Sequence, residues 1–411
     1  MTLHASPAAD RRPIRLLTFT TLYPNPEQPQ HGVFVENRLR HLLASGAAET
    51  RVVAPVPWFP LTAERFGTYG SYARVPRHEE RHGIAIDHPR YFLPPKIGMV
   101  PAPLLLYWGA RRAVDRLRRD GYDFDVIDAH YFYPDGVAAA LLAQALGKPL
   151  VITARGTDIN LIPQYDVPRR LIQWAAGRAS AMITVCAALK TALSELDAPA
   201  DRITVLRNGV DLRNFHPIDP GQARTRLGEA PGGLLLASVG HLIERKGHHH
   251  VIGALADLPQ ARLVVAGTGP ERAALEALAQ RLGVGDRVRF LGHVPHQELA
   301  QLYSAADALV LASSREGWAN VLLEAMACGT PVVASDIWGT PEVVAAPEAG
   351  RLMPELSAVG VARAVTDLLA ARPDRADTRR YAERFSWDET TAGQIAIFEK
   401  LRHAAPTARS R

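Results

Sequence analysis

The chain has 411 residues, of which 47% are hydrophobic and 22% are charged, and its formal net charge is +5. This length favours two domains, and the composition excludes disordered and fibrous proteins. No apolar run approaches the roughly eighteen residues of a membrane-spanning helix, so the chain is not expected to cross a bilayer. The positive charge fits either an anionic partner or an arginine-rich solvated surface.

Residues 1–13 are polar and contain prolines where a signal peptide would have its apolar region, so we expect a disordered tail there. The two cysteines, Cys186 and Cys328, lie in apolar stretches without paired spacing. This usage favours a reducing compartment. Together these features predict a cytoplasmic protein.

Apolar, β-rich runs alternate with helical patterns through the first half of the chain. Strands are expected at 14–20, 51–56, 124–130, 149–156, 181–186 and 203–209. Continuous apolar strands of this kind are typical of parallel sheets that helices cover on both faces.

One stretch of the first half, VPAPLLLYWGA followed by RRAVDRLRR, changes from apolar to basic between 100 and 119. This order suits a helix that lies against an anionic membrane, at the cytoplasmic face of the inner membrane. The alternative is an ordinary amphipathic surface helix. The sequence leaves both interpretations open.

A polar segment broken by prolines, 210–222, is a candidate linker, after which the alternation begins again. Strands are expected at 233–240, 262–269, 288–292, 308–313 and 331–335. The fold class is therefore α/β, with two doubly wound domains at 14–212 and 213–385. Ligands of such sheets bind beyond the carboxyl ends of the strands, so the chemistry is expected in a cleft between the domains.

The segment EGWANVLLEAMACGTPVV, residues 316–333, predicts a loop and a helix directly after an apolar strand. Asn320 is suited to cap the helix start and Gly329 to end the helix. The free N–H groups of Asn320, Val321 and Leu322 would then form an anion pocket that suits a diphosphate.

Two carboxylates flank this helix start. Glu324, one turn inside the helix, is placed to accept hydrogen bonds from two ribose hydroxyls, and Glu316 is placed to reach a group beyond the phosphates. The alternative is a solvated loop residue at 316 and a dipole-favoured helix residue at 324.

The whole segment resembles the E-x7-E segment of retaining glycosyltransferases of family 4, which have the GT-B architecture. Further segments are similar to the same family: 22–42, 129–143, 154–160, 238–255, 264–271, 290–313 and 385–401. The resemblance implies two Rossmann-like domains that bind a sugar nucleotide between them. It also implies a terminal helix, 386–404, that crosses back onto the first domain.

The resemblance assigns roles to residues that match the family's motifs. It implies that Gly32 lets the backbone approach the donor phosphate, which a residue without Cβ permits. It implies that His130 contacts the sugar at the reaction centre and that Lys246 binds the distal phosphate. Glu316, His130 and Lys246 are the expected catalytic residues.

The loop after the second domain's first strand departs from the family's pattern, because His241 follows Gly240 where an arginine is common. Arg245 or Arg155 would then supply part of the phosphate neutralisation. His293 and Val294 match the stretch whose backbone reads the base, which leaves uracil and guanine open. The expected donor-binding residues are Gly32, Gly240, His241, Arg245, His293, Val294, Asn320, Val321, Leu322 and Glu324.

The implied function is hexosyl transfer with retention from a UDP- or GDP-linked sugar to a saccharide or lipid-linked acceptor, in polysaccharide or cell-envelope biosynthesis. The resemblance implies no metal, no cofactor and no nucleic acid. Asp123-Phe124-Asp125 is a weak metal motif, and His248, His249 and His250 point in different directions on a helix. The alternatives are a GT-B-type sugar-nucleotide epimerase and a catalytically idle, membrane-associated nucleotide-binding protein.

Overall fold

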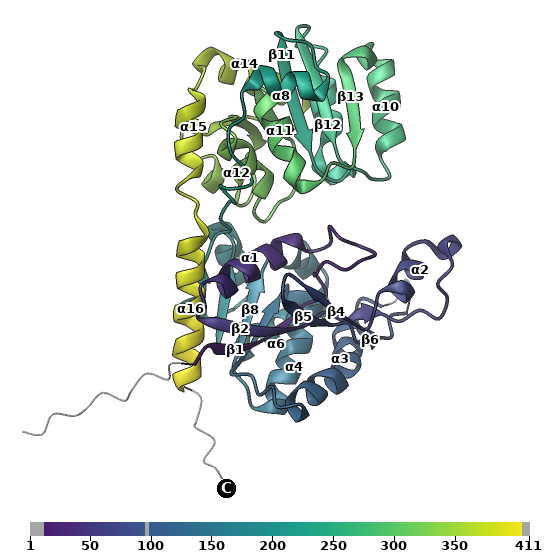
Figure 1. Ribbon diagram of the computed structural model, residues 1–411, viewed down its shortest axis with the longest axis vertical. Coiled ribbons are helices and arrows are strands. Elements are labelled where there is room, and N and C mark those ends of the chain that lie inside the picture. The colour runs from purple at the N-terminus through teal and green to yellow at the C-terminus, as the bar shows by residue number, and fades with distance from the viewer. Residues whose placement is uncertain (1–11, 95–97, 405–411) are drawn as a thin grey trace, which may run out of the picture.

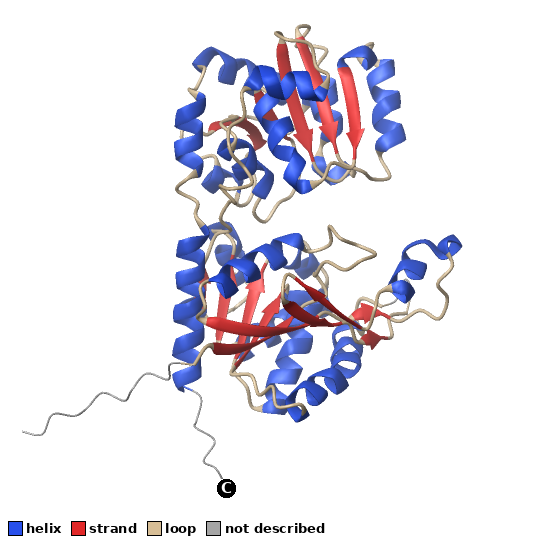
Figure 2. Ribbon diagram, viewed as in Figure 1, coloured by secondary structure: helices blue, strands red, loops and turns tan. Residues whose placement is uncertain are grey.

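The computed structural model describes residues 12–94 and 98–404, and the tail expected at 1–13 lies outside this part except for its last two residues. Two α/β domains are stacked along the longest axis of the molecule (Figure 1). Helices cover both faces of each sheet (Figure 2), as the continuous apolar strands predicted.

The first domain is built on an eight-stranded sheet in the order β10-β9-β8-β7-β1-β2-β5-β4. All its pairs are parallel except the hairpin of β4 and β5. The strands are β1 (Ile14–Phe19), β2 (Ala48–Val53), β4 (His78–Arg81), β5 (Ile84–Asp87), β7 (Val126–His130), β8 (Leu150–Ala154), β9 (Ala181–Thr184) and β10 (Ile203–Val205), and β3 (Val56–Pro57) pairs separately with β6 (Arg90–Tyr91). The helices are α1 (Val33–Ala44), α2 (Gly67–Arg74), α3 (Ala102–Arg119), α4 (Val137–Leu146), α5 (Thr157–Asn160), α6 (Asp166–Arg178) and α7 (Ala187–Ser194).

The second domain has a six-stranded parallel sheet in the order β13-β12-β11-β14-β15-β16. Its strands are β11 (Leu234–Val239), β12 (Ala261–Ala266), β13 (Val288–Gly292), β14 (Ala308–Leu311), β15 (Val332–Ser335) and β16 (Gly350–Met353). Its helices are α8 (Pro220–Leu227), α9 (His248–Ala254), α10 (Arg272–Arg281), α11 (Leu299–Ala305), α12 (Asn320–Ala327), α13 (Thr340–Val343), α14 (Ala358–Ala371) and α15 (Arg375–Ala382).

The segment expected as a linker contains the start of a helix. Asp219 accepts a hydrogen bond from the Gln222 N–H at 2.9 Å, and Pro220 occupies the first turn of α8. Proline is favoured at this position because its missing N–H would have no partner in the helix. Pro220, one of the prolines that indicated a break in the chain, therefore also marks the start of a helix.

The last helix, α16 (Trp387–Ala404), returns to the first domain, which confirms the predicted crossing (Figure 1). Trp387 stacks on His41 of α1 with ring centroids 4.9 Å apart. Phe398 is fully buried in the core that also contains Ile14 and Leu16 of β1. The first domain therefore includes the last helix of the chain.

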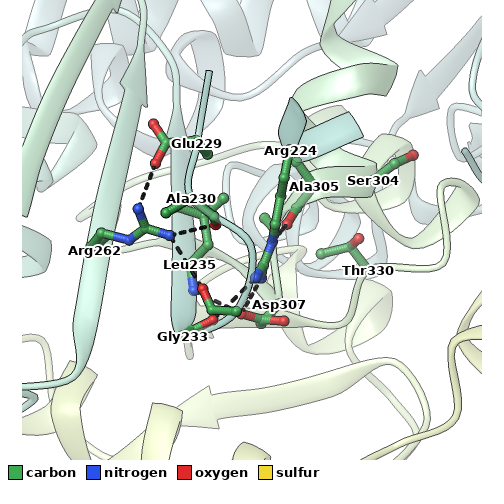
Figure 3. A network of polar contacts seen from close by, with 12 residues as sticks. Arg224, Glu229, Ala230, Gly233, Leu235, Arg262, Ser304, Ala305, Asp307 and Thr330 are labelled. Atoms are coloured by element: carbon green, nitrogen blue, oxygen red, sulfur yellow. Dashed lines mark hydrogen bonds and ion pairs between the residues drawn. The ribbon is translucent and has the colours of Figure 1, made fainter. Parts of the chain in front are cut away.

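A polar network fixes α8 to the amino-terminal edge of the second sheet (Figure 3). Arg224 is 8% exposed and donates to the Ala305 carbonyl at 3.0 Å and to Asp307 Oδ2 at 2.8 Å. Asp307 Oδ2 also accepts from the Leu235 N–H at 2.7 Å. Because this edge is opposite the carboxyl ends of the strands, the network has a structural role.

Candidate active site

The helix start predicted in residues 316–333 lies at the carboxyl end of β14 and faces the first domain. α12 begins at Asn320, and Ala319 occupies the cap position without a side-chain cap, so the prediction that Asn320 is the cap was wrong by one residue. The Asn320 side chain instead accepts a hydrogen bond from Asn208 of the first domain at 3.2 Å. The helix ends at Ala327, Cys328 is its C-cap, and Gly329 follows with φ +77, as predicted.

The first turn of α12 leaves two N–H groups for a ligand. The Leu322 N–H bonds to the Ala319 carbonyl at 3.1 Å, so the prediction that this group is free was wrong. In the described part of the chain, the N–H groups of Asn320 and Val321 have no partner. The helix begins with a tight 3₁₀-type turn, in which the N–H of its third residue, Leu322, bonds to the carbonyl three residues before it. This turn explains why two N–H groups are free and not three.

Glu316 lies in the loop between β14 and α12 and is 9% exposed. Lys246 Nζ donates to Glu316 Oε1 at 2.6 Å, and Arg245 Nη1 lies 3.9 Å from Glu316 Oε2. Burial alone would raise the pKa of Glu316, but the charge and hydrogen bond of Lys246 outweigh it, so the pKa is lowered. The site therefore holds an ionised carboxylate between two cations.

Glu324 points from α12 toward the loop before α11. It accepts hydrogen bonds from His296 Nε2 at 3.0 Å and from the buried Tyr303 hydroxyl at 2.9 Å. Burial lowers the pKa of His296, but the hydrogen bond and charge of Glu324 outweigh it and raise the pKa. A carboxylate has about four acceptor positions, so these contacts leave Glu324 capacity for a ligand's hydroxyls.

His296 was not predicted. It follows Val294 by two residues in the loop whose backbone was assigned to the base. Nothing in the local pattern distinguishes it from the other histidines of the chain. Only the packing of α11 against α12 brings it to Glu324.

His130 stands at the end of β7 and is 1% exposed. Its Nδ1 faces Arg155 Nη2 at 2.7 Å, and its Nε2 faces Asp128 Oδ2 at 3.2 Å. Burial lowers the pKa of His130, so the ring is neutral. Because arginine can only donate, Nδ1 accepts and the proton lies on Nε2, toward Asp128. Nδ1 is engaged by Arg155, whereas neither oxygen of Asp128 accepts a hydrogen bond within the described residues, and it is Arg155 that lines the cleft.

Gly32 caps α1 with φ +72, in the left-handed region that favours glycine. A Cβ at this position would lie 2.3 Å from the carbonyl oxygen of Leu22. Leu22 itself lines the cleft. The close approach of two backbone segments therefore requires glycine here, and contact of Gly32 with a donor phosphate stays a prediction.

Six of the ten expected donor-binding residues lie away from the cavity walls: Gly32 and Leu322, already described, and four others. Gly240 lies against the side chain of Lys246, because a Cβ built on Gly240 would be 3.6 Å from Lys246 Cδ. His241 is exposed. His293 is also exposed, and Val294 packs on the core. None of the four lines either cavity described below, and their roles stay predictions.

The cleft contains two adjoining cavities. One, of about 430 Å³, is lined by Arg155, Arg245, Lys246, Glu316 and the start of α12. The other, of about 790 Å³, is lined by Glu324, His296 and parts of α1 and α16. Phe34 and Asn320 line both. The arrangement provides a cationic cavity for phosphates and a neighbouring cavity in which Glu324 is available to a nucleoside.

The two domains touch next to Glu316. A Cβ on Gly317 would lie 2.0 Å from the Arg155 carbonyl oxygen, and a Cβ on Gly156 would lie 3.0 Å from Gly317 Cα. Asn160 Nδ2 donates to the Glu316 carbonyl at 3.2 Å. Two glycines facing each other therefore allow the backbones of the domains to meet at the site.

A second contact between the domains lies on α13. Glu342 accepts from the Ala187 N–H at 2.6 Å, at the start of α7, and from Arg207 Nε at 2.9 Å. These bonds join the carboxyl edges of both sheets. The conformation is closed.

The weak metal motifs have structural partners. Asp123 pairs with Lys148 at 2.9 Å, and Asp125 accepts from the Arg15 N–H at 2.9 Å. His248 Nδ1 lies 2.9 Å from the Ser238 hydroxyl. Within residues 12–94 and 98–404, no group of three or more His, Cys, Asp or Glu side chains is arranged to hold a metal ion.

The two facing Rossmann-like domains, with a cationic cavity where the second sheet leads into α12, define a transferase of the GT-B architecture. Family models match both domains: Glycosyltransferase Family 4 over residues 31–214 and Glycosyl transferases group 1 over residues 221–385. The chain belongs to this glycosyltransferase family.

Relatives support the assignment over most of the chain. The D-inositol 3-phosphate glycosyltransferase of Frankia alni is 35% identical over 69% of this chain and 75% of its own. The putative teichuronic acid biosynthesis glycosyltransferase TuaC of Bacillus subtilis is 29% identical over 86% and 88%. The crystal structure of Anabaena HepE in complex with UDP has a TM-score of 0.70 at 24% identity and covers 93% and 98% of the two chains.

Proposed function

We propose that the protein transfers a hexose, with retention, from a UDP- or GDP-linked donor to a saccharide or lipid-linked acceptor in polysaccharide or cell-envelope biosynthesis. The main support is the meeting of Lys246, Arg245 and the free N–H groups of α12 in one cavity beside Glu316. The UDP bound to HepE and the teichuronic acid biosynthesis for which TuaC is named are consistent with this donor class and pathway.

The donor is proposed to extend across both cavities. Its diphosphate lies against the Asn320 and Val321 N–H groups, where the helix dipole favours negative charge. Its ribose hydroxyls reach Glu324 in the larger cavity, and its sugar lies beside Glu316 in the smaller one. The Lys246 ammonium has three protons, of which one is directed to Glu316, so it retains donors for a phosphate.

Catalysis is proposed to depend on charge. Departure of the diphosphate is stabilised by Lys246 and the helix start, a type of contribution whose loss typically costs about 10²–10³ in rate. The acceptor attacks from the face that the phosphate leaves, and a phosphate oxygen takes its proton. Glu316 holds sugar hydroxyls and balances positive charge at the sugar. No metal or other cofactor is proposed.

Incubation with UDP- and GDP-hexoses and a mixture of saccharide acceptors tests the proposal. We expect the donor to be consumed only when acceptor is present, a product with the donor's anomeric configuration by NMR, and unchanged rates in EDTA. A new sugar nucleotide formed without acceptor would identify an epimerase. Nucleotide binding without consumption of any donor would identify an idle protein.

Contact with an anionic membrane surface is proposed through α3. Leu104 and Trp108 are 54% and 63% exposed on consecutive turns, and exposed Arg112 and Arg116 continue the same face. No helix in the described part of the chain is long and apolar enough to span a bilayer. A helix with this face suits the membrane boundary, at the cytoplasmic side.

Sedimentation with phosphatidylglycerol vesicles measures this contact. We expect the chain to pellet at low salt and Trp108→Ser to pellet several-fold less, because the indole is lost from the apolar part of the face. Leu282→Ser changes an apolar side chain of the second domain that is 42% exposed and serves as the control. Equal sedimentation of both variants would contradict the proposal.

A further inference from the structure

A third cavity opens next to the donor cavity, on the side of the first domain. Its volume is about 470 Å³, and it is lined mainly by rings and aliphatic groups. The principal lining residues are Tyr69, Tyr91, Leu93, Met99, Tyr131 and Tyr133. Among the lining residues that the structure describes, which exclude 95–97, none is charged, in contrast to the donor cavity with Arg155, Arg245, Lys246 and Glu316.

Tyr131 separates this neutral cavity from the donor cavity and lines both. It follows His130 directly and has φ +83, a conformation that bulky side chains rarely adopt. Its backbone is held there by a hydrogen bond from its N–H to the Thr153 carbonyl and by one from the Gly136 N–H to its own carbonyl, both 2.8 Å. Such strain clusters at ligand-contacting positions, where the surrounding structure maintains it.

Two polar side chains on the wall of the neutral cavity are engaged by the protein. The Tyr133 hydroxyl donates to the Met99 carbonyl at 2.5 Å, and the Thr21 hydroxyl donates to Asp135 at 3.0 Å. With these groups occupied, the wall offers a sugar few partners for its hydroxyl groups, which costs affinity. The wall is therefore suited to a hydrocarbon group.

Exposed apolar residues flank the lining residues of the cavity in sequence. Phe92 adjoins Leu93 in sequence, Val100 adjoins Met99, and Leu104 begins the exposed face of α3. The exposed fractions are 38% for Tyr69, 57% for Phe92, 45% for Met99, 51% for Val100 and 54% for Leu104. Exposed apolar side chains beside an apolar cavity are typical of an interaction site.

We propose that the neutral cavity binds the hydrocarbon chain of a lipid-linked acceptor, whose reacting hydroxyl meets the donor sugar past Tyr131. The proposal rests on the proposed function, because it assigns the acceptor class for the same transfer. The three cavities then hold, in order, the nucleoside, the diphosphate with its sugar, and the acceptor lipid. The chain of the lipid leaves over the apolar rim toward α3.

Titration calorimetry with n-hexyl, n-octyl and n-decyl β-D-glucopyranoside, each below its micellar concentration and with UDP present, tests this assignment. We expect affinity to increase about fourfold for each methylene that becomes buried. Met99→Asp places a charge on the cavity wall at a position exposed enough to tolerate it, and we expect the dependence on chain length to disappear. Leu282→Asp changes a similarly exposed apolar residue outside the cavity, and we expect this variant to keep the dependence of affinity on chain length.

Lack of binding, affinity independent of chain length, or equal loss in both variants would overturn the assignment. Titrations of the unaltered protein, Met99→Asp and Leu282→Asp with UDP report on the donor cavity alone. Normal UDP binding with no chain-length dependence would therefore reject the lipid cavity and leave the proposed donor chemistry in place. Failure to bind both UDP and GDP, or to consume any UDP- or GDP-linked donor, would reject the proposed function whatever the result with the glucosides.

Discussion

Replacing Glu316 by glutamine is expected to lower kcat by about 10²–10³-fold and to leave the affinity for UDP or GDP nearly unchanged. The amide keeps the shape of the carboxylate but removes the charge that faces Lys246 and Arg245. In the proposed reaction, a neutral group at 316 balances less of the positive charge that develops on the sugar. Steady-state kinetics and nucleotide titration measure the two quantities separately.

The control for this experiment is Glu195→Gln, an exposed carboxylate of the first domain outside both donor cavities. It changes the net charge by the same amount and is expected to leave kcat unchanged. Near-normal turnover of Glu316→Gln would show that the carboxylate is a structural partner of Lys246 only. Lost nucleotide affinity would place the residue in phosphate binding instead.

Replacing Gly317 by alanine is expected to reduce kcat/KM by about 10²-fold, because displacement of reacting groups by about 1 Å is sufficient for such a loss. The new methyl group would lie 2.0 Å from the Arg155 carbonyl oxygen. The closed contact between the domains therefore has to open, which moves Glu316 away from the first domain. Small-angle scattering should show an expanded particle.

Gly177→Ala is the matched control, since a Cβ there would meet nothing within 4 Å. It lies within α6, where alanine is favoured over glycine. We expect both variants to fold, and only Gly317→Ala to lose activity and to expand. A closed, fully active Gly317→Ala would mean that the backbone at 156 and 317 moves apart without cost to the reaction.

The sequence predicted the parallel sheets well because each central strand is a continuous apolar run. It missed the hairpin of β4 and β5, whose first strand, HEER, is charged and lies at the edge of the sheet. An edge strand with charged side chains has no apolar pattern to detect, although charge there protects against unwanted pairing. β16 was missed as well, since only two of its four residues are buried.

The candidate site could be predicted where its residues share one segment. Glu316, Asn320 and Glu324 follow from a strand, a loop and a helix start in continuous sequence, and Lys246 follows from the resemblance. The roles of His130 and Arg155 could not be separated, because the orientation of the histidine depends on Asp128 beside it and on the next strand. Contacts such as Gly156 with Gly317 join residues of different domains and leave no local signal.

The return of α16 makes the first domain discontinuous in sequence. Phe398 completes a core whose other buried residues lie between Ile14 and Ile183, all in the first domain. During synthesis, the first domain therefore remains without one of its core side chains until the whole second domain has been made. The core of the first domain is therefore closed only when α16 docks on it, which links the folding of this domain to the synthesis of the second.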